Sequence, residues 1–146
     1  MPRFEPNPAR RPALVAGASS GIGAATALEL ASRGFPVALG ARRVEKCQAL
    51  VDQIRAGGGE AVAIPLDVTD QDSVKGFVHR ATEELGDIEL LVAGAGDTYF
   101  GRLYEISPEE FESQVQIHLI GAFRLANAVL PGMVERQRGD VIFVGS

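Results

Sequence analysis

The sequence predicts an α/β fold, namely a doubly wound parallel sheet that carries helices on both faces. Five short apolar segments alternate with four segments of helical periodicity, which is the order of strands joined by crossover helices. The strand segments are apolar at consecutive positions, as in residues 141–144 (Val-Ile-Phe-Val). Strands that are buried on both faces have this pattern. Glycines follow the first and fourth segments, at the strand ends where ligands bind in such sheets.

The expected strands are residues 13–16, 36–40, 60–66, 89–93 and 140–144, and the expected helices are 20–33, 42–56, 69–85 and 108–136. Ser107 and Pro108 indicate the start of the last helix, as a side-chain cap followed by proline at the first helical position. Residues 1–12 contain several prolines and arginines without apolar periodicity. We therefore expect a flexible N-terminal tail, followed by one domain at 13–146.

The composition is typical of a single globular domain. The chain has 146 residues, 46% hydrophobic and 23% charged, which is enough for one sizeable core. The net charge of -5 argues against a nucleic-acid partner. Because no apolar stretch approaches about 18 residues and the first residues lack a secretory signal, we expect no membrane contact and a cytoplasmic location. One cysteine and no Cys/His group with zinc spacing predict no metal site.

The turn after the first strand is predicted to bind the diphosphate of a dinucleotide. A strand, a glycine-rich turn and a helix follow one another directly, so backbone N–H groups and the helix dipole can face an anion. The spacing is G-x-x-x-G-x-G, which differs from the common G-x-G-x-x-G of the Rossmann fold. A glycine-rich turn without a ligand is the alternative. The candidate residues are Gly17, Ser19, Ser20, Gly21, Ile22 and Gly23.

The residues after the second strand favour NADP(H) over NAD as the cofactor. No acidic residue occurs from 34 to 44, whereas Arg42 and Arg43 lie directly after the strand. An acid there reads a free ribose 2′-hydroxyl, while arginine suits a 2′-phosphate. Ser19 would add a hydroxyl donor. The alternative is that both arginines are solvated charges at the start of a helix.

Two further strand ends carry cofactor-binding candidates. Asp67 and Val68 follow the third strand, where a carboxylate can accept a hydrogen bond from the adenine amino group. Asp67 can equally well only shape the turn into the next helix. The fourth strand ends in Ala93, Gly94 and Ala95, and glycine at a strand end allows a ligand to approach the backbone.

Taken together, these motifs resemble the short-chain dehydrogenase/reductase family in its classical form. The opening motif of that family, Thr-Gly-x-x-x-Gly-x-Gly, matches residues 16–23 with Ala16 in place of threonine. Residues 91–96 are similar to its Leu-Val-Asn-Asn-Ala-Gly segment, but both asparagines are absent. Residues 117–121 match its Asn-x-x-Gly, with His118 at the asparagine position, and residues 139–146 resemble the strand that ends in the catalytic serine, here Ser146.

The resemblance implies an oxidoreductase that interconverts a small-molecule alcohol and a carbonyl by hydride transfer. In the family, a serine hydrogen-bonds the substrate oxygen, a tyrosine transfers the proton, and a lysine four residues later lowers the tyrosine pKa. Ser146 is the one member of this trio found here, since Leu103 follows Tyr99 at that spacing and Pro108 follows Tyr104. We therefore expect the first five strands of a longer enzyme whose C-terminal part is missing. The alternative is a nucleotide-binding module without chemistry, a sensor or a scaffold.

Two further expectations concern the long helix. By resemblance, His118 would hold a water in a proton relay, whereas the alternative is a helix histidine bonded to a backbone carbonyl. Apolar residues lie on more than one side of the helix 108–136, so one side is expected to meet the sheet and another side a partner. The resemblance implies a homodimer or homotetramer formed through this helix, and the alternative is that further chain covers it.

Overall fold

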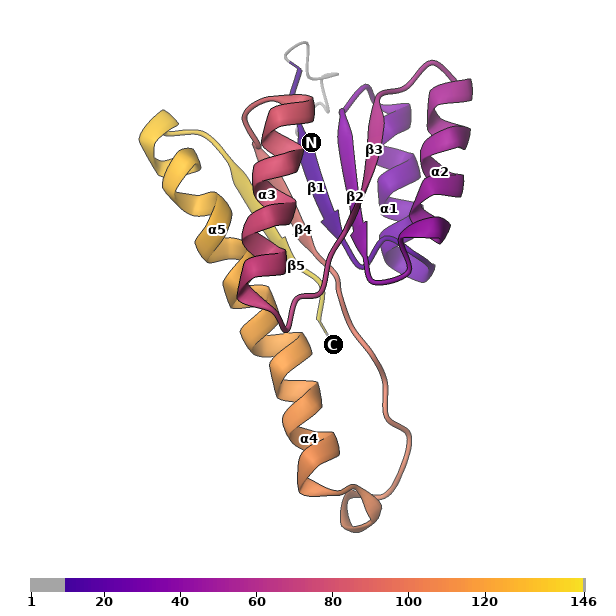
Figure 1. Ribbon diagram of the computed structural model, residues 1–146, viewed down its shortest axis with the longest axis vertical. Coiled ribbons are helices and arrows are strands. Elements are labelled where there is room, and N and C mark those ends of the chain that lie inside the picture. Colours follow the sequence, from indigo (N-terminus) through magenta and orange to yellow (C-terminus); the bar gives the residue numbers. More distant parts are fainter. Residues whose placement is uncertain (1–9, 146) are drawn as a thin grey trace, which may run out of the picture.

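The structure is a computed structural model that describes residues 10–145. Its centre is one parallel sheet in the order β3-β2-β1-β4-β5, shown in Figure 1. The central strand β1 pairs with β2 on one side and β4 on the other, so that Leu14 lies between Ala38 and Leu91. The strands are β1 (Ala13–Ala16), β2 (Val37–Ala41), β3 (Ala61–Pro65), β4 (Leu90–Ala93) and β5 (Asp140–Phe143). The predicted doubly wound parallel sheet is confirmed.

The helices also follow the predicted order, with one difference in the last of them. The expected helix at 108–136 includes one segment of π-helix, in which the backbone is locally wider than an α-helix. A short 3-10 helix, which the sequence did not predict, precedes it. The helices are α1 (Gly21–Ser32), α2 (Val44–Ala56), α3 (Gln71–Leu85), η1 (Leu103–Glu105), α4 (Pro108–Val115), η2 (Gln116–Ile120, the π segment) and α5 (Gly121–Arg136).

Two apolar cores lie on the two faces of the sheet. Successive residues of β1 alternate between them, with Leu14 in the core under α3 and α5 and Val15 in the core under α1 and α2. Phe77 is the largest fully buried side chain of the first core, and Cys47 is buried in the second. Both faces of the central strands are therefore covered, which explains their continuous apolar sequences.

The first described residues differ from the expected flexible tail. The carbonyl oxygen of Pro12 accepts hydrogen bonds from the backbone N–H groups of Glu89 and Leu90, at 3.0 and 3.2 Å. The Arg11 side chain forms ion pairs with Glu89 and Asp140. The Pro12 carbonyl and the Arg11 guanidinium therefore have defined partners at the starts of β4 and β5, where the sequence predicted a flexible tail. Residues 1–9 lie outside the described residues.

The long helix has one covered and one open side. Leu125, Val129 and Met133 are buried in the core, whereas Leu119 and Phe123 are 67% and 65% exposed. Among the described residues, 108–136 form one helix that is long and apolar enough to cross a membrane, with a mean hydropathy of 1.4 over its most apolar window. We expected no such stretch from the sequence. The core helix of a sheet protein passes the same test of length and composition, and α5 buries one side in this way.

Candidate functional site

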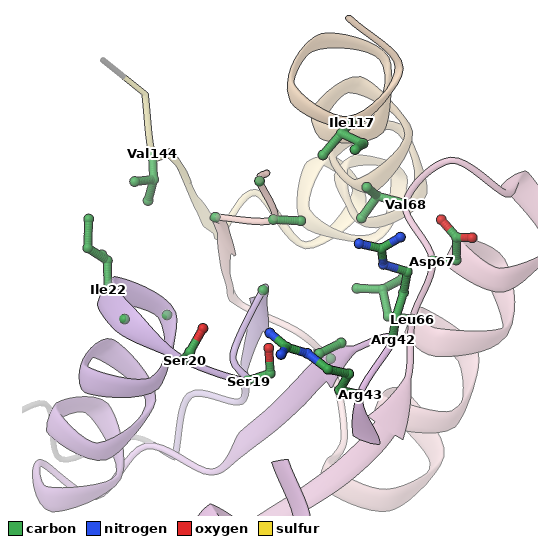
Figure 2. A pocket seen from close by; sticks show the side chains of 18 of the residues that line it. Ser19, Ser20, Ile22, Arg42, Arg43, Leu66, Asp67, Val68, Ile117 and Val144 are labelled. Carbon is green, nitrogen blue, oxygen red and sulfur yellow. The ribbon is translucent and has the colours of Figure 1, made fainter. Parts of the chain in front are cut away.

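A cleft of about 430 Å³ opens at the carboxyl end of the sheet, over the point where the strand order reverses between β1 and β4. Figure 2 shows side chains from several strand ends around it. Twelve of the thirteen predicted cofactor-binding residues line this cleft: Gly17, Ser19, Ser20, Gly21, Ile22, Gly23, Arg42, Arg43, Asp67, Val68, Gly94 and Ala95. The fold therefore brings together residues from four separate strand ends.

The glycine turn holds the start of α1 close to the sheet. A Cβ atom on Gly23 would lie 2.2 Å from the carbonyl oxygen of Gly17, so no larger residue fits there without a backbone shift. Gly21 has φ +57, and a Cβ built on it would meet nothing within 4 Å. Ser20 caps the helix without a side-chain hydrogen bond, and no acidic residue occurs in the first turn. The positive end of α1 is thus open to an anion from the cleft.

Arg42 and Arg43 follow β2 and line the same cleft as the glycine turn. Both are exposed, and within residues 10–145 neither side chain has an ion pair or a hydrogen bond. Figure 2 shows the guanidinium of Arg43 near Ser19 and that of Arg42 on the side of Asp67. The two unpaired guanidinium groups and the open helix start outweigh the one carboxylate of Asp67 in the same cleft, and such a set of donors fits phosphate groups.

The carboxylate of Asp67 is held by its own turn. Its Oδ1 accepts hydrogen bonds from Thr69 Oγ1 at 2.7 Å and from Thr69 N at 2.9 Å. These two bonds lower the pKa of Asp67, partial burial opposes them, and the charges of Arg42 and Arg124 lower it further. The Val68 carbonyl accepts a hydrogen bond from Arg124 of α5 at 3.1 Å. Asp67 therefore shapes the turn, as the alternative expected, and still lines the cleft.

Ala93 and His118 are the predicted residues that do not line this cleft. Ala93 is buried at the end of β4, and both residues line a second cavity of about 390 Å³, bounded by η2, α5 and the end of β5. Ala95, Ile117 and Val144 line both cavities, which are therefore adjacent. His118 contacts the backbone after β4, with its Nε2 atom 2.7 Å from the carbonyl oxygen of Asp97. Ser146 lies outside the described residues.

Sequence reasoning missed several lining residues. Thr69 was detectable, because threonine two residues after aspartate is a common turn pattern. Ile117 was not, because it depends on where the π segment of the long helix lies. The cleft residues outside the thirteen predicted cofactor-binding residues are Gly40, Ala41, Leu66, Thr69, Gly96, Thr98, Ile117 and Val144.

The fold and the cleft define a Rossmann-type nucleotide-binding domain. Comparison with known proteins gives the family: the family model described as short chain dehydrogenase matches residues 11–146. The chain belongs to the short-chain dehydrogenase family, as the motifs predicted.

Similar proteins include reductases and dehydrogenases. The chain is 42% identical to glycine betaine reductase ATRR of Emericella nidulans over 92% of its own length and 11% of that protein. It is 35% identical to the 3-oxoacyl-[acyl-carrier-protein] reductase FabG of Staphylococcus aureus, over 92% of this chain and 55% of that one. The chain therefore spans about half the length, or less, of these curated relatives.

Two solved structures resemble the fold closely. An alcohol dehydrogenase from the archaeon Thermococcus sibiricus, complexed with 5-hydroxy-NADP, has a TM-score of 0.86 and 36% identity, over 91% of this chain and 57% of that one. A metagenomic short-chain oxidoreductase in complex with NADP has a TM-score of 0.85 and 36% identity, over 90% of this chain and 60% of that one. Both of these similar proteins therefore hold an NADP-type cofactor.

Proposed function

We propose that this chain is the nucleotide-binding part of an NADP(H)-dependent oxidoreductase that interconverts an alcohol and a carbonyl. The observation that carries the proposal is the pair Arg42 and Arg43, unpaired within residues 10–145 and lining one cleft with the open start of α1. Family membership and the NADP-type cofactors of two similar structures support it. A dinucleotide with an additional ribose phosphate matches this set of donors.

The order of the strands determines which part of the cofactor each group of cleft residues would bind. Arg42 and Asp67, on the β2 and β3 side, would hold the 2′-phosphate and the adenine. The N–H groups at the start of α1, beside β1, would bind the diphosphate. The residues 94–96 after β4 would then face the nicotinamide half. When bound, the nicotinamide accepts or donates the hydride, and the protein supplies orientation and proton transfer.

The substrate half of the proposal rests on Ser146 and on chain beyond the described residues. A serine hydroxyl at the end of the fifth strand would donate a hydrogen bond to the substrate oxygen, on which negative charge develops during hydride transfer to a carbonyl. We further propose a cytoplasmic protein with a small-molecule substrate, no nucleic-acid or membrane partner, and a homodimer or homotetramer. The exposed Leu119, Phe123 and Val134 on the long helix support an interface there.

The test compares two cofactors in one variant. Arg42→Ala should weaken NADPH binding roughly tenfold to a hundredfold, because a charged hydrogen-bond donor to phosphate is lost, while NADH affinity changes little. Titration calorimetry on the intact protein measures both constants. Lys75→Ala, an exposed charge on α3 away from the cleft, is the control for net charge. Equal weakening of NADPH and NADH by Arg42→Ala would refute the NADP preference.

An assay on the intact protein distinguishes an enzyme from a nucleotide-binding module without chemistry. Within residues 1–146 neither tyrosine has a lysine four residues later, so turnover has to be tested on the intact protein. An enzyme oxidises NADPH when supplied with a panel of aldehydes and ketones, whereas a module binds NADPH without turnover. The absorbance of NADPH at saturating cofactor decides between them.

A further inference from the structure

Arg124 links the long helix to the turn that follows β3. Its Nη1 atom donates a hydrogen bond to the carbonyl oxygen of Val68 at 3.1 Å, across 56 positions of sequence. The strand β3 is the outermost strand on one side of the sheet, whereas α5 leads into β5 on the opposite side. This bond therefore joins two parts of the fold that are far apart in both sequence and strand order.

The long helix comes close to this turn at a glycine. A Cβ atom built on Gly121 would lie 2.7 Å from Val68 Cγ2 and 2.8 Å from Val68 Cβ. Val68 is 5% exposed and belongs to the same apolar core as Leu125, the residue after Arg124. The glycine lets the backbone of α5 approach the turn, so that the Arg124 guanidinium reaches the Val68 carbonyl.

The turn lines the cleft, and the arginine that holds it does not. Asp67, Val68 and Thr69 are lining residues of the cleft, whereas Arg124 is not one of them. Inside the turn, Thr69 donates to Asp67 Oδ1, and the Asp70 N–H donates to the Asp67 carbonyl oxygen. The bond from Arg124 is different, because it ties the turn to another element of the fold.

We propose that Arg124 is a positioning residue, which holds the turn 67–69 against α5 and so shapes the part of the cleft that takes the adenosine of the cofactor. This proposal rests on the proposed NADP(H) function. Adenosine is common to NADPH and NADH, so loss of the bond should weaken both dinucleotides by the same factor. Arg42, which would bind the 2′-phosphate, should instead act on NADPH alone.

The first test measures both dinucleotides in one variant of the intact protein. Arg124→Met keeps an apolar stem and removes the donor. It should raise the Kd of NADPH and the Kd of NADH about fivefold to tenfold each, as expected for one lost hydrogen bond and a loosened turn. A larger effect on NADPH than on NADH would mean that Arg124 acts by its charge on the additional phosphate. Unchanged Kd values for both would mean that the turn does not depend on Arg124, and either result would overturn the proposal.

Failure of the proposed function gives a different result in the same titrations. An unmodified protein that binds neither dinucleotide refutes the NADP(H) function, and the role of Arg124 fails with it. An unmodified protein that prefers NADH refutes only the NADP(H) preference, and Arg124→Met should then still weaken NADH binding by the same factor. The two failures are therefore distinguishable.

The second test separates the hydrogen bond from the packing of the side chain. Lysine and methionine have stems of similar length, but only lysine ends in an N–H donor. Arg124→Lys should therefore keep the Kd of both dinucleotides within about threefold of the unmodified protein, whereas Arg124→Met should not. Equal affinities of the two variants would refute the bond to Val68 as the working contact. Lys75→Met, at an exposed lysine of α3, controls for the loss of one positive charge.

A third measurement needs no cofactor. Hydrogen exchange of the unliganded protein reports how often the turn opens. In Arg124→Met, the amides of Thr69 and Asp70, both bonded to Asp67, should exchange about fivefold faster. The amide of Gly94, which is bonded to β1, should keep its rate. Equal acceleration of all three amides would show a loss of global stability and would contradict the positioning role.

A double-mutant cycle tests the close approach of the helix. Gly121→Ala places a methyl group against Val68, so α5 must move away from the turn and NADPH binding should weaken. In the Arg124→Met background the same change should have a smaller effect, because the bond that needs the close approach is already gone. Strong coupling supports the proposal, and simple additivity of the effects on NADPH binding contradicts it.

The matched control for Gly121→Ala lies on the same helix. A Cβ atom built on Gly132 has the guanidinium of Arg136 as its nearest neighbour, and this end of a flexible side chain can move aside. Gly132→Ala should therefore leave the Kd of NADPH unchanged. Thermal unfolding of every variant controls for folding. A Gly132→Ala variant that weakens NADPH binding as much as Gly121→Ala would refute a specific contact between α5 and the turn.

Discussion

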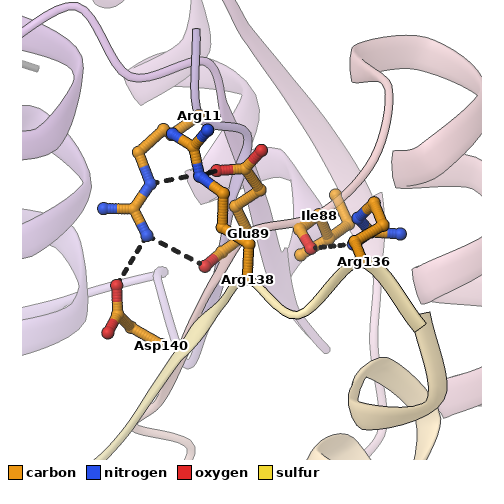
Figure 3. Close-up of polar contacts among 6 residues, drawn as sticks. All are labelled: Arg11, Ile88, Glu89, Arg136, Arg138 and Asp140. Atoms are coloured by element: carbon orange, nitrogen blue, oxygen red, sulfur yellow. Dashed lines mark hydrogen bonds and ion pairs between the residues drawn. The ribbon is translucent and has the colours of Figure 1, made fainter. Parts of the chain in front are cut away.

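The arginines at the two ends of the parallel sheet differ in whether they have partners within the chain. At the amino end, the Arg11 guanidinium pairs with Glu89 and Asp140, and Arg138 Nε lies 2.8 Å from Glu89 Oε2, as Figure 3 shows. These contacts raise the pKa of Arg11, the hydrogen bond to Asp140 most of all. At the carboxyl end, Arg42 has no such partner within residues 10–145. The amino end thus contains charges that stabilise the sheet, whereas the carboxyl end keeps charges available for a ligand.

The helix starts show the same contrast. Asp70 accepts a hydrogen bond from Asp72 N at 2.9 Å at the start of α3, and Ser107 accepts one from Glu110 N at 3.1 Å at the start of α4. Ser20, at the start of α1, accepts none from its helix. A cap at Ser20 would occupy the N–H groups that an anion needs. The uncapped helix therefore indicates a place where stability and binding compete.

The largest predicted effect is at the tightest contact of the carboxyl end. Gly23→Ala places a methyl group 2.2 Å from the Gly17 carbonyl oxygen, so α1 must move away from the turn. We expect a loss of about 2–4 kcal/mol in the free energy of unfolding, together with loss of NADPH binding. Urea unfolding and calorimetry measure the two effects.

The matched control for this change is also a helical glycine. Gly76 lies exposed within α3, and a Cβ there meets nothing within 4 Å. Gly76→Ala should raise stability by about 0.5–1 kcal/mol, because alanine is the better helix former. Similar results for Gly23→Ala and Gly76→Ala would show that the close approach of α1 to the turn has no consequence.

The second prediction is a change at Ser20 that should raise stability and lower cofactor affinity. Ser20→Asp puts a carboxylate at the open start of α1, where it can accept from the first-turn N–H groups. Stability should rise by about 0.5–1 kcal/mol, while NADPH affinity should fall at least tenfold, because a negative charge occupies the anion site. Ser107→Ala, which removes the cap of α4, should lower stability by about 1 kcal/mol and leave affinity unchanged. A Ser20→Asp variant that binds NADPH normally would place the diphosphate elsewhere.

The third prediction tests the ion pairs at the amino end of the sheet. Arg11→Met keeps an apolar stem but removes the bonds to Glu89 and Asp140. Because the Arg11 side chain is only 18% exposed, we expect a loss of about 1–2 kcal/mol with unchanged NADPH affinity. Arg33→Met removes an ion pair to Glu29 whose side chains are 64% and 61% exposed, and should cost at most about 0.5 kcal/mol. A change in NADPH affinity in Arg11→Met would mean that the two ends are coupled.

Much of this fold was predictable from local sequence. Apolar runs, glycines at helix ends and helix caps predicted the order of strands and helices along the chain. The strand β1 was predicted with its observed bounds, Ala13–Ala16. The π segment Gln116–Ile120 was not predicted, because its residues have ordinary helical periodicity and the wider turn depends on packing. The contacts of Arg11 were missed for a similar reason, since its partners Glu89 and Asp140 are more than 75 positions away.

The cleft residues were predictable where the residue type itself indicates a role at a strand end. Glycines at a strand end and arginine after β2 carried that information, and the structure places them together. Ala93 was predicted as a cofactor residue from its place in a strand end, yet its side chain points away from the cleft and lines the second cavity. Alternation along β4 decides this orientation. The sequence could not reveal the Asp97 contact of His118, because it depends on how the loop after β4 returns to the helix.

The smallest predicted effect concerns the acid dependence of Asp67. Its pKa is lowered in the folded protein, chiefly by the two hydrogen bonds from Thr69, relative to about 3.9 in an unfolded chain. The ionised form therefore stabilises the fold above the unfolded-state pKa, and this contribution disappears as the pH falls through the folded-state pKa. Asp67→Asn should be less stable than the unmodified protein at pH 7, with a gap that narrows below about pH 4. Thr69→Val should reproduce part of the gap, and the two changes together should not add. Urea unfolding at pH 7 and pH 3 measures the difference in the free energy of unfolding between Asp67→Asn and the unmodified protein. A difference of the same size at both pH values would show that the Asp67 carboxylate is not held by its turn.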